Sequence, residues 1–384
     1  MFVDAITLAA VADEWRTLLI GARIDTVIQP TEYAVAIQCY TPAGGGQGGQ
    51  NRWLYFSAHP QLARVHLTAR KPAKIVTEPP AFIMLLRKYL EGTRIEAIEQ
   101  PRWERVIEII VGARREAEGD ERIRYRLIIE IMGRLSNIIV CDARGMILGS
   151  LKHVGAEVNR YRVIAPNIPY VAPPPQMRAV GEQSLPRLDP AMLTASQLSA
   201  LTMEEAARPA PVKKGRARSP EPPTLWQLLS RNVSGFSPLL AREVVYRATG
   251  DSESLPVQDE NAWEELAWNA REMATLPHTR AWMPQLVERI EQAGEAVSPG
   301  RLQVRGGADP TTPGRPQTIQ RYVACAPYVL EQYTEQPGVK IISLSSINAV
   351  IDEFYAGTEW RDAMESVRAP VRRVLHTQLE RCRR

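Results

Sequence analysis

The sequence predicts an α+β fold, in which a strand-rich N-terminal domain is followed by a mainly helical one. Three observations predict it: a series of short apolar runs, two helical patterns beside them, and proline clusters that end the first domain near residue 175. The runs are strand-like and cover residues 33–39, 53–57, 64–68, 94–100, 105–111, 124–131 and 137–141. We therefore expect residues 1–176 to form a β-sandwich or barrel flanked by helices.

Two helices are expected in the N-terminal domain. Asp4 is a good N-cap for a helix over residues 5–20, and Gly21 stands just past its end, where the left-handed conformation favours glycine. Pro80 opens a second helix, which closes at Gly92.

The rest of the chain divides by composition. Residues 177–300 are expected to form a helical domain, and residues 208–223 a disordered insertion, because that stretch is rich in proline and charge. Residues 301–360 are expected to form a linker and a small β/α segment. Residues 361–384 are expected to be the start of a truncated coiled-coil helix.

Composition limits the function only weakly. The chain has 384 residues, 45% of them apolar, and a formal net charge of +4, which is too small to indicate nucleic-acid binding by itself. Of the 47 basic residues 40 are arginine, which binds phosphate and stacks on bases better than lysine does. A GC-rich genome or a thermophilic source would produce the same bias.

Several function classes lack their signals. No apolar run reaches the roughly 18 residues of a membrane span, and no signal peptide is visible. The four cysteines lie far apart, without zinc-site spacing, and no P-loop or nucleophile elbow is present. We expect a cytoplasmic protein that is not an enzyme, with no cofactor, metal, membrane or small-molecule substrate.

The middle of the chain carries a helix-hairpin-helix pattern. The hairpin residues Gly235, Phe236 and Ser237 precede the helical run PLLAREVVYRA. Backbone N–H groups at such a helix N-terminus can hold a phosphate. The alternative is an ordinary connection in which Gly235 only supplies a positive φ.

Longer stretches carry a more specific resemblance. SAHPQLARVHLT (57–68), EPPAFIMLLRKYLEG (78–92), IEQPRWERV (98–106), IEIMGRLSNIIV (129–140), LKHVGAEVNRYRVIAPNIPYVAPPPQ (151–176) and GFSPLLAREVVYR (235–247) occur in this order. Together they resemble the NFACT family of ribosome-associated quality-control factors, long known in bacteria as fibronectin-binding protein A. The resemblance is weaker over residues 317–384, and the family's coiled coil and C-terminal NFACT-R domain are expected to be absent.

This resemblance implies both fold and partners. The N-terminal domain of the family is similar to formamidopyrimidine-type glycosylases. Family members bind large ribosomal subunits that carry peptidyl-tRNA, recruit a tRNA (tRNA-Ala in bacteria) and promote template-free alanine tailing of the stalled chain. The ribosome makes the bonds. Without the coiled coil, this chain is expected to bind ribosomes weakly.

The resemblance also implies tRNA-binding residues. The family's early Asp matches Asp4, and its Asp-Arg pair matches Glu104-Arg105, so this chain has a carboxylate longer by one methylene. Arg105 can bind a phosphate bidentately or stack on an unpaired base, whereas Glu104 can only orient it or accept a hydrogen bond. The alternatives are a plain N-cap for Asp4 and a weak surface ion pair for Glu104-Arg105.

Two polar stretches complete the predicted interface. Both could contact an RNA backbone; the alternatives are a self-satisfied turn for the first and a solvated face for the second. The residues are Arg134, Ser136 and Asn137 in the first stretch and His153, Asn159, Arg160 and Arg162 in the second.

The sequence leaves two alternative functions to consider. A DNA glycosylase of the similar fold would need an N-terminal proline amine as nucleophile, whereas this chain begins Met1-Phe2-Val3. A fibronectin-binding adhesin would need export, for which no signal is visible.

Overall fold

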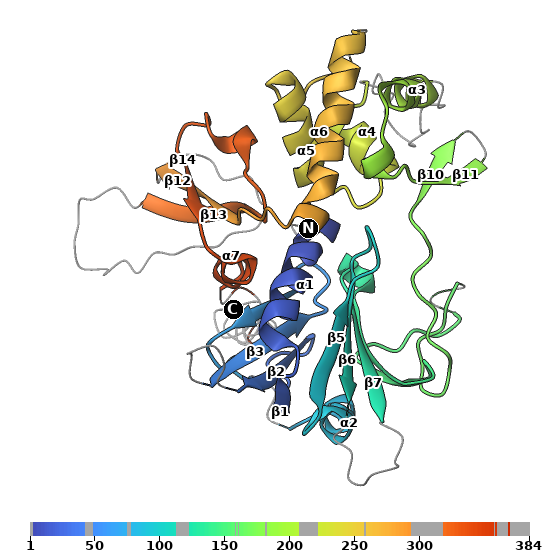
Figure 1. Ribbon diagram of the computed structural model, residues 1–384, viewed down its shortest axis with the longest axis vertical. Helices are drawn as coiled ribbons and strands as arrows, with labels where there is room; N and C mark the ends of the chain where they lie inside the picture. Colours follow the sequence, from blue (N-terminus) through green and yellow to red (C-terminus); the bar gives the residue numbers. More distant parts are fainter. Residues whose placement is uncertain are drawn as a thin grey trace, which may run out of the picture.

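The computed structural model describes residues 3–42, 49–74, 78–112, 123–157, 159, 161–180, 183–206, 222–256, 259–292, 318–356, 358 and 368. Nearly all of the predicted insertion at 208–223 and of the predicted coiled-coil helix at 361–384 lies outside these residues. The described chain forms three groups of elements, which Figure 1 shows around the N-terminus.

Both helices of the N-terminal domain begin and end where their sequence signals predict. Helix α1 (Ala5–Leu19) starts at Asp4, whose side chain accepts a hydrogen bond from the backbone N–H of Thr7, and Gly21 follows with a φ of 82°. Helix α2 (Ala81–Leu90) follows Pro80, and Gly92 has a φ of 83°. These predictions are confirmed.

The strands of this domain form one antiparallel sheet in the order β4-β3-β2-β1-β5-β6-β7-β8-β9. The predicted α+β class is confirmed, and the sandwich-or-barrel prediction is refined to a single nine-stranded sheet. Its strands are β1 (Arg23–Ile28), β2 (Ala34–Thr41), β3 (Gln50–Ser57), β4 (Arg64–Thr68), β5 (Arg94–Glu99), β6 (Val106–Gly112), β7 (Arg124–Glu130), β8 (Asn137–Asp142) and β9 (Ile147–Ser150).

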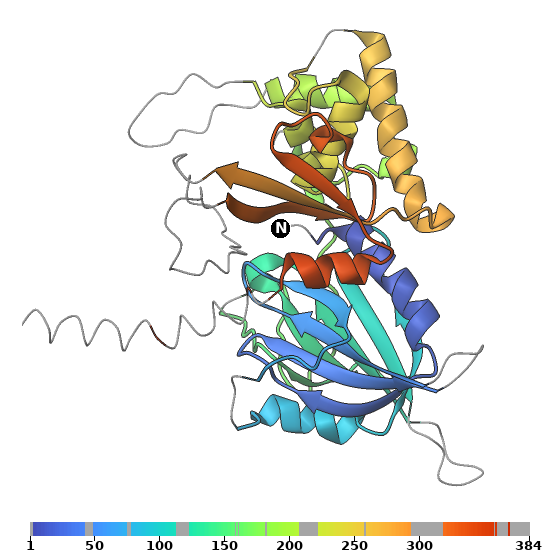
Figure 2. The ribbon, with the colours of Figure 1, turned by 90° about the vertical axis from the view of Figure 1, so that its left-hand side faces the viewer.

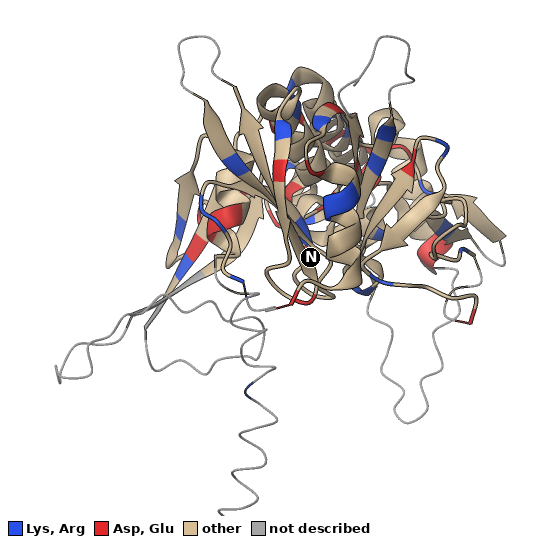
Figure 3. Ribbon diagram, turned by 90° about the horizontal axis from the view of Figure 1, so that it is seen from below, with Lys and Arg blue, Asp and Glu red and all other residues tan. Residues whose placement is uncertain are grey.

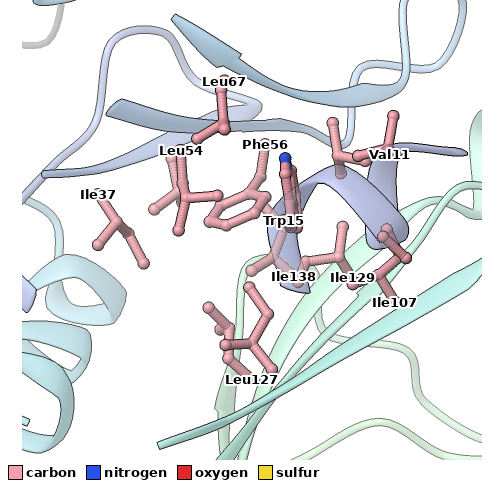
Figure 4. Close-up of a cluster of buried hydrophobic side chains, with 14 of the residues drawn as sticks. Val11, Trp15, Ile37, Leu54, Phe56, Leu67, Ile107, Leu127, Ile129 and Ile138 are labelled. Carbon is pink, nitrogen blue, oxygen red and sulfur yellow. The ribbon is translucent and has the colours of Figure 1, made fainter. Parts of the chain in front are cut away.

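The sheet folds where β1 meets β5, because only Arg23 and Arg94 pair in register there. Its two halves then share one core with α1, in which Trp15 is fully buried. Figure 4 shows Trp15 between Phe56 of one half and Ile138 of the other. The apolar face of α1 therefore holds the two halves together, and the N-terminus of α1 points toward the helical domain (Figure 1).

The middle of the chain is mainly helical, as predicted. A small hairpin of β10 (Met177–Val180) and β11 (Gln183–Pro186) leads into four helices, whose core also takes in Ile6 of α1 and buried residues between 287 and 330. These helices are α3 (Ala195–Ala206), α4 (Leu225–Asn232), α5 (Pro238–Thr249) and α6 (Glu260–Thr279).

One element corrects the sequence analysis. Strand β12 (Gln285–Gln292) lies in the segment predicted to be helical and pairs with both β13 (Thr318–Ala326) and β14 (Val339–Ser343). Its apolar residues at 286, 287 and 290 also fit a helical stripe, so local periodicity could not identify the strand. The predicted boundary at residue 300 consequently falls between two paired strands.

Helix α7 (Ile347–Phe354) joins the C-terminal sheet to the N-terminal domain. It lies between the three-stranded sheet and the nine-stranded sheet (Figure 2) and contacts α1 and β4. The buried Asn348 accepts hydrogen bonds from Trp15 Nε1 at 2.9 Å and from the backbone N–H of Leu67 at 2.7 Å. Among the described helices, none is long and apolar enough to cross a membrane.

Candidate nucleic-acid interface

A cavity of about 690 Å³ opens beside the junction of the N-terminal and helical domains. Its walls come from the loop before β6, the turn before β8, the segment after β9 and the connection into the helical domain. Eight of the residues predicted from the sequence line it: Glu104, Arg105, Arg134, Ser136, Asn137, His153, Asn159 and Arg162. The fold thus brings together residues that are up to 58 positions apart in the chain.

The loop that carries Glu104 and Arg105 is held on both sides. Gln100 donates through Nε2 to the carbonyl oxygens of Ala5 and Glu104, at 2.8 and 3.0 Å. Trp103 has a φ of 61°, which is uncommon for a large residue, and its indole N–H donates to Asp189 at 3.1 Å. These contacts fix the backbone from which the Arg105 side chain leaves.

The charges of this loop are half-buried, unlike those of a surface ion pair. Burial lowers the pKa of Arg105, against the charges of Asp4 and Glu104, which raise it. Burial raises the pKa of Glu104, against a hydrogen bond with Gln176 and the charges of Arg105 and Arg187. Partial desolvation strengthens the interaction of such groups with a ligand charge.

Among the lining residues that the sequence did not identify are the polar residues Lys152, Gln176 and Arg187. Lys152 and Gln176 lie in the stretch 151–176 that carries the family resemblance, but neither is among the residues predicted to bind tRNA. Arg187 follows β11 in a stretch with no motif, and only the fold carries it to the cavity. Burial lowers its pKa, as does the nearby charge of Arg105.

In the turn before β8, two of the predicted residues bond to the protein's own backbone, as the self-satisfied-turn alternative expects. Ser136 is fully buried, and its hydroxyl accepts the backbone N–H of Met132 at 2.7 Å. Asn137 is also buried, and its amide accepts from the backbone N–H of Lys152 and donates to the carbonyl oxygen of the same residue. Both side chains therefore hold the wall of the cavity, whereas Arg134 is exposed at its rim.

Arg162 is a further correction. Its guanidinium binds both carboxylate oxygens of Glu130 at 2.6 Å, and its side chain is only 6% exposed. Tyr170 donates to the same carboxylate at 2.9 Å. Because its charge is already paired with Glu130, Arg162 supports the wall of the cavity and offers no unpaired charge to a ligand. Of the neighbouring predictions, His153 is exposed, Asn159 is half-buried, and Arg160 lies outside the described residues.

Asp4 and the predicted hairpin are joined by a hydrogen bond between their side chains. Asp4 is 3% exposed, and its carboxylate accepts the hydroxyl of Ser237 at 2.6 Å as well as the N–H and hydroxyl of Thr7. Ser237 in turn caps α5 by accepting the N–H of Leu240 at 3.1 Å. Both side chains are therefore engaged by hydrogen bonds at the N-termini of α1 and α5, as the N-cap alternative for Asp4 expects.

The rest of the hairpin is also covered. Gly235 has a φ of 74°, and its N–H donates to Gln176 Oε1 at 3.3 Å. A Cβ at this position would come within 3.2 Å of both Ala5 and Trp103. Phe236 is 5% exposed. The hairpin thus packs closely against the N-terminal domain, and the N–H of Gly235, one of the predicted phosphate donors, is already hydrogen-bonded to Gln176.

Positive charge gathers at the cavity although it does not dominate the molecule. Basic and acidic positions interleave over the described ribbon seen from below (Figure 3). Around the cavity, by contrast, Arg105, Arg134, Lys152 and Arg187 stand against a single lining carboxylate outside the Arg162 pair, that of Glu104. In the described part of the chain, no group of three or more His, Cys, Asp or Glu side chains could hold a metal ion.

Comparison with known proteins connects this geometry to a family. A family model described as "NFACT N-terminal and middle domains" matches residues 4–384. The "Rqc2 homolog RqcH" of Bacillus subtilis (strain 168) is 34% identical over 249 residues, which cover 65% of this chain and 38% of that protein. RqcH of Streptococcus pneumoniae serotype 2 is 39% identical over 178 residues, 45% of this chain and 30% of that protein. The chain therefore spans less than two fifths of the length of these relatives.

A solved structure shares the fold. The fibrinogen-binding protein from Staphylococcus aureus superposes with a TM-score of 0.59 at 22% sequence identity, covering 92% of this chain and 98% of that one. At this identity the similarity shows the architecture, and the binding named in the description belongs to that protein.

Proposed function

The chain belongs to the NFACT family, and from this membership we propose that it acts in ribosome-associated quality control by binding tRNA at the cavity around Arg105. In this proposal it recognises obstructed large ribosomal subunits that carry peptidyl-tRNA and recruits a tRNA, tRNA-Ala in bacteria. The recruited tRNA supports alanine tailing of the stalled chain. The similarity to RqcH supports the pathway, and the cavity supports the site.

The single observation that carries the site is the half-buried Arg105 on a fixed loop at the wall of this cavity. A volume of about 690 Å³ lies within the usual range of ligand pockets, roughly 300–1,000 Å³. An arginine in such a place can pair with a phosphate through two N–H groups or stack on an unpaired base. Exposed cations at the rim would attract the RNA backbone from a distance.

We propose a binding role rather than a chemical one. The lining groups suit recognition: guanidinium and amide donors, with one carboxylate able to accept from a base edge or a 2′-hydroxyl. The peptidyl-transferase centre would then form the bonds, and this protein would position the substrate. Helices α4 and α5 would act as a helix-hairpin-helix that fixes the cavity wall.

Binding of purified tRNA to this chain and to Arg105→Ala tests the proposal. If Arg105 makes a bidentate or base-specific contact, the variant should lose about 1–3 kcal/mol, or roughly 5- to 150-fold in affinity. Arg124→Ala is the matched control, because Arg124 is a half-exposed arginine of β7 that pairs with Glu96 away from the cavity.

Crosslinking and sequencing of bound RNA adds the identity of the ligand. We expect tRNA to be enriched with the wild type and depleted with Arg105→Ala. Equal tRNA affinity of the wild type and Arg105→Ala would refute this site.

A further inference from the structure

A second arginine faces the same cavity from the other domain. Arg187 lines the cavity together with Arg105, and the charge of Arg105 lowers the pKa of Arg187. Its outer nitrogen Nη1 donates to Ser230 O at 3.2 Å and to Gln176 Oε1 at 3.4 Å. Its Nε is buried and has no hydrogen-bond partner among the described residues. Arg187 thus lines the cavity and keeps one buried donor that has no partner among the described residues.

The charge balance of this corner favours an incoming anion. Two guanidinium groups share it, whereas Glu104 is the one carboxylate that opposes Arg187. Asp4 acts on Arg105 only from within the domain joint, where its oxygens are already hydrogen-bonded. An N–H without a partner and the repulsion between the two guanidinium groups would both be relieved by a ligand with several acceptor oxygens.

We propose that Arg187 and Arg105 together bind one phosphate group of the RNA backbone, so that Arg187 is a phosphate-binding residue of this site. The inference rests on the proposed function and adds a residue and a ligand chemistry to it. A phosphate offers oxygens in a geometry that suits the forked N–H groups of arginine.

The two arginines belong to different domains, so a phosphate bound by both would connect them. Arg187 N donates to Gln176 O at 3.0 Å, and the next residue pairs with the α4–α5 connection, where Leu188 N donates to Asn232 O at 2.8 Å. Arg105 directly precedes β6 of the N-terminal sheet, and its carbonyl accepts Ile131 N at 2.8 Å. A phosphate held by both side chains would therefore bridge the two domains and stabilise their junction.

Salt-dependent RNA binding by Arg187→Gln tests the proposal. Loss of one phosphate contact should weaken binding at least about fivefold and lower the slope of log affinity against log salt by about one. The factor should be equal for tRNA and for an unstructured RNA of the same length, because a phosphate carries no sequence information. Arg187→Lys should keep the slope and recover part of the affinity.

Two controls separate a binding role from a structural one. Arg178→Gln removes an arginine of the adjacent hairpin whose partner is Glu204 and whose Nε is likewise buried, and it should leave the slope unchanged. Arg105→Ala and Arg187→Gln combined should lose less than the sum of their separate effects if both hold one phosphate. Thermal unfolding of every variant shows whether the fold is intact.

The outcomes distinguish this inference from the proposed function. A wild type that binds tRNA while Arg187→Gln keeps the same affinity and slope overturns the inference alone. A wild type that binds both RNAs equally, with Arg187-dependent slopes, supports the phosphate contact and removes the tRNA specificity. Stabilisation by inorganic phosphate alone, without Arg187-dependent RNA binding, would assign the site to free phosphate and overturn the RNA contact.

Discussion

The hydrogen bond between Ser237 and Asp4 should be among the most costly to remove, because it caps one helix and joins two domains. Ser237→Ala deletes a hydroxyl that donates to Asp4 at 2.6 Å and accepts from Leu240 N at 3.1 Å. Loss of an N-cap costs about 0.5–2 kcal/mol. Loss of a hydrogen bond to a charged group costs about 1.5–3 kcal/mol, and here the carboxylate stays buried. We expect a total of about 2–4 kcal/mol.

Urea unfolding followed by tryptophan fluorescence measures this loss. The matched control is Asp259→Ala, which removes the exposed N-cap of α6 and should cost only the ordinary cap energy, about 1 kcal/mol. A double-mutant cycle with Asp4→Asn should give a coupling of about 1–2 kcal/mol. The reasoning is refuted if Ser237→Ala costs no more than Asp259→Ala and the cycle shows no coupling.

The remaining predictions concern ion pairs and the docking of α7. Arg162→Met leaves a buried carboxylate unpaired and should cost about 3–5 kcal/mol, whereas Arg124→Met, at a pair whose arginine side chain is 54% exposed, should cost much less, about 1 kcal/mol, in the same unfolding assay. Asn348→Ala removes the acceptor of two buried N–H groups, so it should cost about 2–4 kcal/mol and speed hydrogen exchange in β4. Burial raises the pKa of Asp352, but the hydrogen bond and charge of His66 outweigh burial and hold that pKa below its ordinary value. The stabilisation of the fold by the Asp352–His66 pair is therefore present at neutral pH and is lost as the pH falls through the lowered pKa. When urea unfolding is compared between about pH 5 and pH 3, the wild type should lose up to about 1 kcal/mol more stability than His66→Gln does. The difference is small because the Asp352 side chain is 45% exposed.

Local signals in the sequence were enough for most elements of the N-terminal domain. Asp4, Gly21 and Gly92 mark helix ends through backbone chemistry that acts within a few residues, and the structure has helices with those ends. Strand β12 shows the limit of such signals. Its pattern suits two periodicities, and pairing with strands that begin 26 and 47 residues beyond its last residue decides between them.

In the candidate site, too, a motif in the sequence identifies some residues, whereas others are identified only by the tertiary fold. The sequence placed Glu104 and Arg105 in the interface through a motif, and both line the cavity. It could not show that Arg162 is neutralised, because its partner Glu130 lies 32 residues away, at the end of β7. Nor could it find Arg187, whose relation to Arg105 exists only after the two domains meet. Whether a polar side chain faces a ligand or its own backbone depends on the tertiary fold.

The N-terminus of α5 shows how this dependence changes a functional assignment. Such an end attracts an anion because its N–H groups carry partial positive charge. Here the anion is the buried carboxylate of Asp4, which reaches the helix through Ser237. Since the protein supplies its own negative charge at this end, a phosphate there would have to displace a buried hydrogen bond. In the cavity, by contrast, Arg187 and Arg105 both line the walls, and the Nε of Arg187 has no hydrogen-bond partner among the described residues. The hairpin is therefore better suited to fixing the domain joint, and the arginines to binding the RNA.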